Sequence, residues 1–193
     1  MARKSRKNSL PKTKSPEEWR SFFAAINTRY DSGCRAHALF YLQYQSGLRI
    51  GEALQLSVKD VDLDLLKVHV RVGKTGARVV PLPEDPMLAR SINRWLEVRA
   101  RWNPDSDLLF VTRTGMPLSS NSARETMKVV AERAGIGHTS CHQLRHSLAT
   151  ELLSQGASPI GVQRILGHRL LSTTLTVYAH AADTHAREAM NHR

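Results

Sequence analysis

The stretch HQLRHSLATELL at residues 142–153 contains both a clear folding pattern and two reactive side chains, His142 and Arg145. Its leucines recur at the spacing of one helix face: Leu144, Leu148, Leu152 and Leu153. This period predicts a helix over about 141–155 whose leucines belong to the core. Gly156 follows, and glycine commonly ends a helix because it adopts the left-handed backbone conformation without strain.

The stretch LGHRLLSTTLTVYAH at residues 166–180 adds two further reactive side chains, His168 and Tyr178. A short helix is predicted over 159–166, ended by Gly167. A further helix is expected to carry Tyr178. The C-terminal third of the chain is therefore predicted to be helical.

Helices are also predicted upstream. Ser15-Pro16-Glu17-Glu18 is a capping box with proline at the first helical position, and it predicts where the folded part of the chain begins. A second helix is expected from about Arg35 to Ser46, ended by Gly47, and a short third helix from about Ile50. Arg49 then falls at a junction between helices, where the backbone can hold its side chain outwards.

Residues 66–82 have the pattern of a β-hairpin. Apolar and polar residues alternate over 66–72, which is the period of a half-buried strand. Gly73-Lys74-Thr75-Gly76 is a turn sequence, and residues 78–82 return the chain. Lys74 is therefore expected at the hairpin tip.

The remaining segments complete a mainly α (α+β) fold with one small antiparallel β-sheet. Residues 86–101 and 119–134 have helical patterns, the second ended by Gly135, and 107–110 is expected to be a short strand or extended segment. The sequence has no internal repeat and no linker after residue 15. One domain over 15–182 is therefore predicted.

The chain is strongly basic, with a formal net charge of +11. More than half of this excess lies in residues 1–14, which contain no acidic residue: Arg3, Lys4, Arg6, Lys7, Lys12 and Lys14. Such a segment is predicted to be a disordered arm that contacts DNA phosphates without sequence preference. A solubilising tail is the alternative interpretation.

Cysteine and apolar content indicate the compartment. Two cysteines, Cys34 and Cys141, cannot form a disulfide framework in a chain of 193 residues. No stretch reaches the roughly 18 apolar residues of a membrane span, and the basic N-terminus lacks the apolar segment of a signal peptide. A cytoplasmic, nucleoid-associated protein is expected.

Six residues together have the chemistry for cutting a phosphodiester with a tyrosine and no metal: Arg49, Lys74, His142, Arg145, His168 and Tyr178. Two arginines can hold the non-bridging phosphate oxygens as charge builds on them. Histidines and a lysine can transfer protons. A tyrosine can be the nucleophile, but its free pKa of roughly 10 requires nearby cations and bases.

Four segments that carry these residues resemble the catalytic domain of a tyrosine recombinase, the lambda-integrase type of site-specific recombinase. The segments occur in the order of that family: QSGLRIGEALQL at 45–56, GKTGARVVPLP at 73–83, HQLRHSLAT at 142–150, and LGH followed by TT and Tyr at 166–178. The resemblance extends over about residues 15–182. It implies the catalytic-domain fold and site-specific DNA recombination, by integration, excision or inversion.

The resemblance implies a role for each reactive residue. Tyr178 would attack one DNA strand, forming a 3′-phosphotyrosyl bond and releasing a 5′-hydroxyl. Arg49 and Arg145 would clamp the scissile phosphate, and Lys74 would protonate the leaving 5′-oxygen. His142 would be the general acid/base.

For the remaining site residues, the resemblance implies that His168 hydrogen-bonds the phosphate and that Glu52 supports the site. No nucleotide cofactor or metal is implied, because the tyrosyl ester retains the phosphodiester energy. A homotetramer on two double-stranded DNA sites, accessory DNA-binding proteins and a C-terminal tail at 183–193 that docks on a neighbouring protomer are implied as well.

The chain departs from most members of this family before the catalytic domain. Those relatives carry a separate helical DNA-clamping domain, where this chain has only the 14-residue arm. Short members that resemble phase-variation invertases, and a truncated relative, both fit this pattern. Two other functions stay open: a catalytically idle DNA-binding relative that modulates a full-length recombinase, and DNA relaxation of the type IB topoisomerase kind.

Each reactive residue also has an ordinary structural interpretation. Lys74 could be a solvated charge, and its position is the least tightly specified of the six. His142 and His146 share a helix face beside Cys141, which suggests zinc. Gln143 stands where a zinc protease would need glutamate, and no third ligand is close in sequence. No metal site is therefore predicted, and His146 is expected to pack under the active site.

Overall fold

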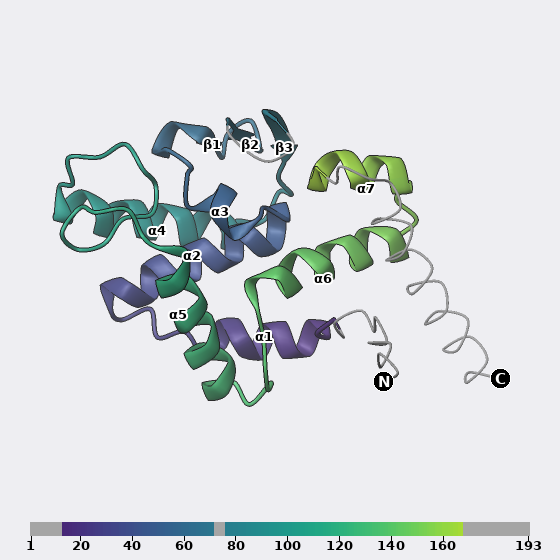
Figure 1. Cartoon of the computed structure of the whole chain (residues 1–193), viewed down its shortest axis with the longest axis horizontal. Helices are drawn as coiled ribbons and strands as arrows, with labels where there is room; N and C mark the ends of the chain where they lie inside the picture. The colour runs from purple at the N-terminus through teal and green to yellow at the C-terminus, as the bar shows by residue number, and fades with distance from the viewer. Residues whose placement is uncertain (1–12, 72–75, 168–193) are drawn as a thin grey trace, which may run out of the picture.

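The computed structural model describes residues 13–71 and 76–167, and within these ranges the chain is mainly helical (Figure 1). Helix α2 (Asp31–Ser46) runs through the middle of the molecule. Helix α1 (Pro16–Ala24) lies on one side of it, and α7 (Pro159–Leu166) lies on the other side, next to the small sheet. The predicted fold class is confirmed.

Helix α1 begins at the predicted capping box. Ser15 Oγ accepts a hydrogen bond from the backbone N of Glu18 at 3.2 Å, and Glu18 Oε2 accepts one from the backbone N of Ser15 at 2.8 Å. Pro16 takes the first helical position, where its missing N–H has no partner to lose. The local sequence is sufficient to place this helix start.

Helix α2 begins at Asp31, four residues before the predicted start at Arg35. The sequence Asp31-Ser32-Gly33 is typical of a loop, yet these three residues form the first turn of the helix. Gly33 is needed for another reason: a Cβ at this position would overlap the carbonyl oxygen of Asn27. The predicted end is confirmed, because Gly47 caps α2 in the left-handed conformation with φ +65°.

The predicted hairpin is confirmed as part of a three-stranded antiparallel sheet of order β1-β2-β3. Strand β2 (Lys67–Val70) pairs with β3 (Arg78–Pro81), with Val70 opposite Arg78. The two-residue strand β1 (Val61–Asp62) was not predicted because it is too short to show a period. Leu66 has a positive φ of 47°, so β2 begins after it.

Within the described residues, the other predicted helices are present with small shifts at their ends, whereas the helix predicted to carry Tyr178 lies outside these residues. The helices present are α3 (Ile50–Ala53), α4 (Pro86–Trp102), α5 (Ser120–Arg133) and α6 (Cys141–Ser154), and a 3-10 turn, η1 (Val58–Asp60), precedes the sheet. Gly135, Gly156 and Gly167 follow their helices with positive φ, as expected. The predicted segment at 107–110 is extended and pairs with Ser57 through Leu108 in an isolated β-bridge.

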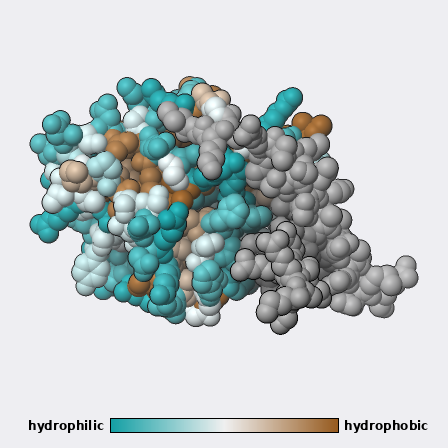
Figure 2. All heavy atoms as spheres, in the orientation of Figure 1, coloured by the Kyte–Doolittle hydropathy of each residue, from teal (hydrophilic) through white to brown (hydrophobic). Residues whose placement is uncertain are grey.

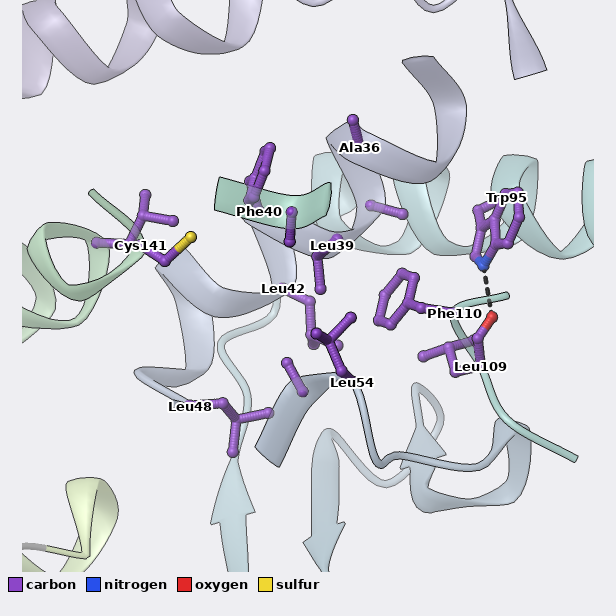
Figure 3. Packing of buried hydrophobic residues seen from close by; sticks show 14 of the residues in the cluster. Ala36, Leu39, Phe40, Leu42, Leu48, Leu54, Trp95, Leu109, Phe110 and Cys141 are labelled. Atoms are coloured by element: carbon purple, nitrogen blue, oxygen red, sulfur yellow. Dashed lines mark hydrogen bonds between the residues drawn. The ribbon is translucent and has the colours of Figure 1, made fainter. Parts of the chain in front are cut away.

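The main hydrophobic core surrounds α2 (Figure 3). Leu39 and Phe40 of α2 are fully buried, as are Trp95 of α4 and Phe110 of the extended segment. The Trp95 indole donates a hydrogen bond to the Leu109 carbonyl at 2.8 Å, so its polar edge is satisfied inside the core. This core joins α1, α2, α4, α5 and the sheet.

A second, smaller apolar cluster lies between α6 and α7. Its buried members are Ala149, Leu153, Val162 and Leu166. Leu144, earlier on α6, belongs to the main core instead, whereas Leu148 and Leu152 are only partly buried. Helix α6 therefore connects the two clusters. The Trp19 indole of α1 donates to Ser147 Oγ of α6 at 2.7 Å and strengthens this connection.

Lys14 contacts the folded body, contrary to its predicted place in the N-terminal arm. Lys14 was assigned to a free arm, but its ammonium forms an ion pair with Glu18 at 3.1 Å and donates a hydrogen bond to the carbonyl of Ile136. Its side chain is 14% exposed. The carbonyl after α5 needs a donor, and the lysine supplies it across the chain, so Lys14 is part of the folded body.

The surface is mainly hydrophilic on the face shown in Figure 2, with hydrophobic residues visible in small areas between polar ones. No helix in the described ranges is both long and apolar enough to cross a membrane. Cys34 and Cys141 are buried free thiols.

Candidate functional site

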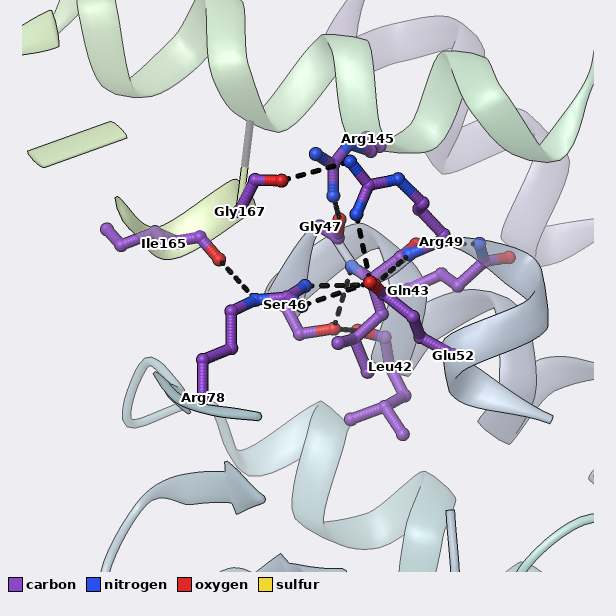
Figure 4. Close-up of polar contacts among 11 residues, drawn as sticks. Leu42, Gln43, Ser46, Gly47, Arg49, Glu52, Arg78, Arg145, Ile165 and Gly167 are labelled. Atoms are coloured by element: carbon purple, nitrogen blue, oxygen red, sulfur yellow. Dashed lines mark hydrogen bonds and ion pairs between the residues drawn. The ribbon is translucent and has the colours of Figure 1, made fainter. Parts of the chain in front are cut away.

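Arg49 and Arg145 lie side by side, although they are 96 positions apart in sequence (Figure 4). Gly47 turns the chain out of α2, so that Arg49 becomes the N-cap residue of α3. Arg145 projects from α6 and donates a hydrogen bond to the carbonyl of Gly47 at 2.7 Å. Arg49 donates to the carbonyl of Gly167, at the end of α7, at 3.0 Å. Three helix ends therefore meet at one pair of guanidinium groups.

The Arg145 guanidinium is buried and only partly satisfied by hydrogen bonds. The residue is 2% exposed, and its Nη2 has no hydrogen-bond partner among the described residues. Burial, followed by repulsion from Arg49, lowers the pKa of Arg145 to about 9. A buried donor without an acceptor costs stability, and an anion that accepted from Nη2 would remove that cost. The arrangement favours a bound anion at this position.

The Glu52 carboxylate holds Arg49 in place and accepts four hydrogen bonds, two on each oxygen. Oε2 accepts from the Arg49 backbone N at 2.9 Å and from Arg78 Nη2 at 2.9 Å. Oε1 accepts from Arg49 Nη1 at 2.9 Å and from Arg78 Nη1 at 3.0 Å. Burial opposes ionisation, but the hydrogen bonds from both arginines outweigh it and lower the pKa of Glu52 to about 2. Glu52 is therefore a permanent anion under ordinary conditions.

Arg78 is the site residue that the sequence analysis did not identify. Its side chain is 12% exposed, and its Nε also donates to the carbonyl of Ile165 in α7 at 3.4 Å. A signal was present in the predicted strand, because Arg78 shares a face with Val80, which is fully buried. A charged residue on the buried face of a strand requires a partner.

His142 lies in the first turn of α6, and its imidazole ring contacts that of the partly buried His146 with 4.5 Å between the ring centroids. Burial and the nearby Arg145 and Arg49 lower the pKa of His142. Burial, His142 and Arg145 lower the pKa of His146 to about 4. Both imidazoles are therefore neutral at neutral pH, a state in which each can accept a proton.

Several predicted site residues lie outside the described residues. These are Lys74, His168, Tyr178 and the arm residues Arg3, Lys4, Arg6, Lys7 and Lys12. Two described residues at the site are nevertheless close in sequence to His168 and Lys74. Gly167, which accepts from Arg49, immediately precedes His168, and Arg78 follows Lys74 by four residues.

The neighbourhood of Cys141 does not resemble a metal centre. Burial raises the pKa of the Cys141 thiol to about 11, so the thiolate that binds metals is strongly disfavoured. Over the ranges 13–71 and 76–167, no cluster of three or more histidine, cysteine or acidic side chains has the geometry to hold an ion. The charge balance is instead that of an anion site, with three guanidinium groups around one carboxylate.

Comparison with known proteins identifies the family. Residues 13–185 match the model of the phage integrase family. Tyrosine recombinase XerC of Corynebacterium glutamicum is 32% identical over 183 residues, which cover 94% of this chain and 58% of the relative. Tyrosine recombinase XerC of Haemophilus influenzae is 33% identical over 181 residues, covering 93% of this chain and 60% of the relative. The chain thus spans about three fifths of the length of these relatives.

Solved structures with the same fold belong to similar proteins. The crystal structure of XerA recombinase has a TM-score of 0.80 and 29% identity, covering 96% of this chain and 66% of that one. The XerH site-specific recombinase, solved bound to palindromic difH substrate in a post-cleavage complex, has a TM-score of 0.81 and 28% identity, covering 95% and 53%. The chain therefore belongs to the phage integrase family and has the fold of a tyrosine recombinase catalytic domain.

Proposed function

We propose that this protein carries out site-specific DNA recombination by cutting and rejoining DNA strands through a 3′-phosphotyrosyl intermediate. The observation that carries the proposal is the Arg49–Arg145 pair with the unpartnered Nη2 of Arg145. A buried guanidinium whose Nη2 lacks an acceptor among the described residues fits a phosphodiester, whose non-bridging oxygens accept hydrogen bonds and carry negative charge. Family membership supports the same function.

In the proposed reaction, the Tyr178 phenol oxygen attacks the scissile phosphorus. A P–O bond to tyrosine forms as the P–O5′ bond breaks, and the 5′-oxygen leaves with a proton from Lys74. Arg49 and Arg145 hold the non-bridging oxygens while charge concentrates on them, the kind of stabilisation that contributes most to such barriers. The reverse attack by a 5′-hydroxyl of another strand rejoins the DNA.

The histidines have separate proposed roles. His142, neutral through its lowered pKa, takes the proton from Tyr178 or returns it as general acid/base. His168 donates a hydrogen bond to the phosphate. Glu52 stays ionised and holds Arg49 in place, which is a supporting role without contact to substrate.

The proposed substrate is double-stranded DNA, and the similar XerH site-specific recombinase, solved bound to its palindromic difH substrate, supports this choice. We propose a homotetramer on two DNA sites, with accessory DNA-binding proteins and a location at the nucleoid. The basic residues 1–12 are proposed to add contacts to DNA phosphates, which makes binding dependent on salt. Residues 15–182 are proposed as the catalytic domain and 183–193 as a tail.

A nicked suicide substrate tests the function. Duplexes built on inverted-repeat sequences that flank the gene should trap a covalent protein–DNA adduct, which resists denaturation and forms equally with EDTA. Tyr178→Phe should form none. An adduct that persists in this variant contradicts the assignment of the nucleophile. Site-specific binding without any adduct identifies an idle regulator, and relaxation of plasmids that lack the site identifies topoisomerase activity.

A further inference from the structure

The Glu52 carboxylate is shared unequally between two arginines. Arg78 approaches it with both terminal nitrogens, one to each oxygen, at 3.0 and 2.9 Å. Arg49 uses its backbone N and only one terminal nitrogen, Nη1. Because a carboxylate has about four acceptor positions, these four bonds saturate it.

Because Arg78 occupies two of the acceptor positions of Glu52, the Nη2 of Arg49 is not used by Glu52 and lies beside the Arg145 guanidinium, where an anion would bind. With Glu52 satisfied by Arg78, the Nη2 of Arg49 points instead to the carbonyl of Gly167, beside Arg145 (Figure 4). Glu52 is 5% exposed and cannot turn to water for a partner. Without Arg78, the guanidinium of Arg49 can form the preferred two-point pair with Glu52, and that pair would draw Nη2 of Arg49 away from the position beside Arg145.

Arg78 also connects the parts of the chain that lead to other reactive residues. It is the first residue of β3 and pairs with Val70, the last residue of β2, so it lies at the end of the strand pair next to the turn sequence that contains Lys74. Its Nε contacts the carbonyl of Ile165, three residues before His168 in the sequence. One largely buried guanidinium of β3 thus contacts α3 through the Glu52 carboxylate and α7 through the Ile165 carbonyl.

We propose that Arg78 is a positioning residue for DNA cleavage: by binding both oxygens of Glu52, it keeps Arg49 turned toward the scissile phosphate and holds the hairpin and α7 against the site. This inference rests on the proposed strand-cleavage function. Arg78 acts through Glu52 and Arg49 and does not itself contact the phosphate.

The first experiment measures cleavage of the suicide duplex by the full chain at saturating protein, together with the half-saturating protein concentration. Arg78→Met is expected to slow single-turnover cleavage about 30-fold while the half-saturating concentration changes less than about 3-fold, since the arginine pair is misplaced but present. Arg78→Lys, which retains a cation beside Glu52, should recover cleavage to within about 5-fold of wild type.

A double-mutant cycle separates positioning from general support of the fold. In a Glu52→Gln background no buried carboxylate competes for Arg49, so Arg78→Met should cost only about 2- to 3-fold. Arg71→Met is the matched control, because Arg71 pairs with the buried Asp60 of the neighbouring 3-10 turn and does not touch Glu52. It should retain wild-type cleavage. Equal effects of Arg78→Met in both backgrounds, or wild-type cleavage by Arg78→Met, would overturn the proposal.

A second measurement does not depend on cleavage. Inorganic phosphate, compared with chloride at equal ionic strength, should raise the thermal unfolding midpoint of the wild type by binding at the arginine pair. Arg78→Met should lose at least half of this shift, and Arg71→Met should keep it. If the wild type forms no adduct but Arg78→Met loses the phosphate shift, the cleavage function fails and the positioning role stands. A wild type with neither adduct nor phosphate shift overturns both.

Discussion

The core around α2 and the α6–α7 unit are held together in different ways. The α2 core buries large aromatic and aliphatic side chains from α1, α2, α4, α5, α6 and the sheet. Helix α7 has a small apolar cluster with α6 and two polar contacts from the site, Arg49 to Gly167 and Arg78 to Ile165. The first region is stabilised mainly by apolar burial, whereas the second also depends on the charges of the site.

The two regions contribute differently: the α2 core contributes mainly to stability, whereas the arginine pair is suited to binding a ligand. Buried apolar surface in the α2 core makes the scaffold rigid without involving any reactive group. The arginine pair, in contrast, contains a buried donor without a partner among the described residues, and repelling cations, which oppose folding. Functional sites commonly retain such locally unfavourable arrangements, because a bound ligand resolves them.

The largest expected effect comes from Arg145→Met, which removes the buried guanidinium and keeps a side chain of similar length. Adduct formation should fall at least about a thousandfold, because a cation at the phosphate is lost. The free energy of unfolding should change by less than about 1 kcal/mol, since an imperfectly satisfied charge leaves the interior. Suicide-substrate assays and urea denaturation measure the two quantities. A loss of several kcal/mol would show that Arg145 holds the fold.

Trp95→Ala in the α2 core is expected to have the opposite effect, a loss of stability without a loss of cleavage activity. Removing this fully buried indole and its bond to Leu109 should lower the free energy of unfolding by about 4 kcal/mol. The protein that stays folded, counted by circular dichroism under the assay conditions, should form adduct at the wild-type rate. Slower chemistry per folded molecule would mean that the two regions are coupled more closely than their contacts indicate.

The third effect concerns the contact between α7 and the end of α2. A Cβ at Gly47 would overlap Leu166 Cδ2, and φ is +65°, so Gly47→Ala should destabilise by about 3 kcal/mol. Gly135→Ala is the control, because φ is +68° and the space is open. It should cost about 1 kcal/mol, the backbone term alone. Leu166→Ala should partly rescue Gly47→Ala in unfolding experiments. Equal losses at the two glycines would exclude a tight α7 contact.

The smallest expected effect is a pH dependence at His146. Its pKa of about 4 in the folded protein lies below the ordinary value of 6.5, so the unfolded chain binds more protons between these values. Stability should therefore fall as pH drops from 6.5 to 4, by roughly 2 kcal/mol. His146→Gln should flatten this slope in urea titrations at several pH values. An unchanged slope in His146→Gln would assign the dependence to other groups.

Local signals predicted most of the described secondary structure. The capping box at Ser15 and the glycines after α2, α5, α6 and α7 lie where expected, because caps depend on a few adjacent residues. The start of α2 was wrong, because Gly33 is required by a contact with Asn27 and does not break the helix. Strand β1 exists only through its pairing with β2. Tertiary contacts overrode local preference in both places.

At the site, too, the sequence predicted some residues correctly, whereas tertiary contacts decided the others. Its predicted residues Arg49, Glu52 and Arg145 meet as expected, whereas Lys14, predicted to contact DNA, is bound to Glu18 and Ile136. Arg78 was missed although its strand was predicted. Alternation shows which face a residue occupies, but it does not identify the partner on that face.

The candidate reactive side chains, the hairpin and most of the described helices could be predicted from the sequence, because residue chemistry and short-range backbone preferences are local. Only the folded chain shows that Glu52 is shared between Arg49 and Arg78, and that Arg145 keeps a donor without a partner among the described residues. The contacts of Arg78 with Glu52 and of Arg49 with Gly167 join residues 26 and 118 positions apart. Their partners are selected by packing and burial, which no periodic pattern in the chain encodes.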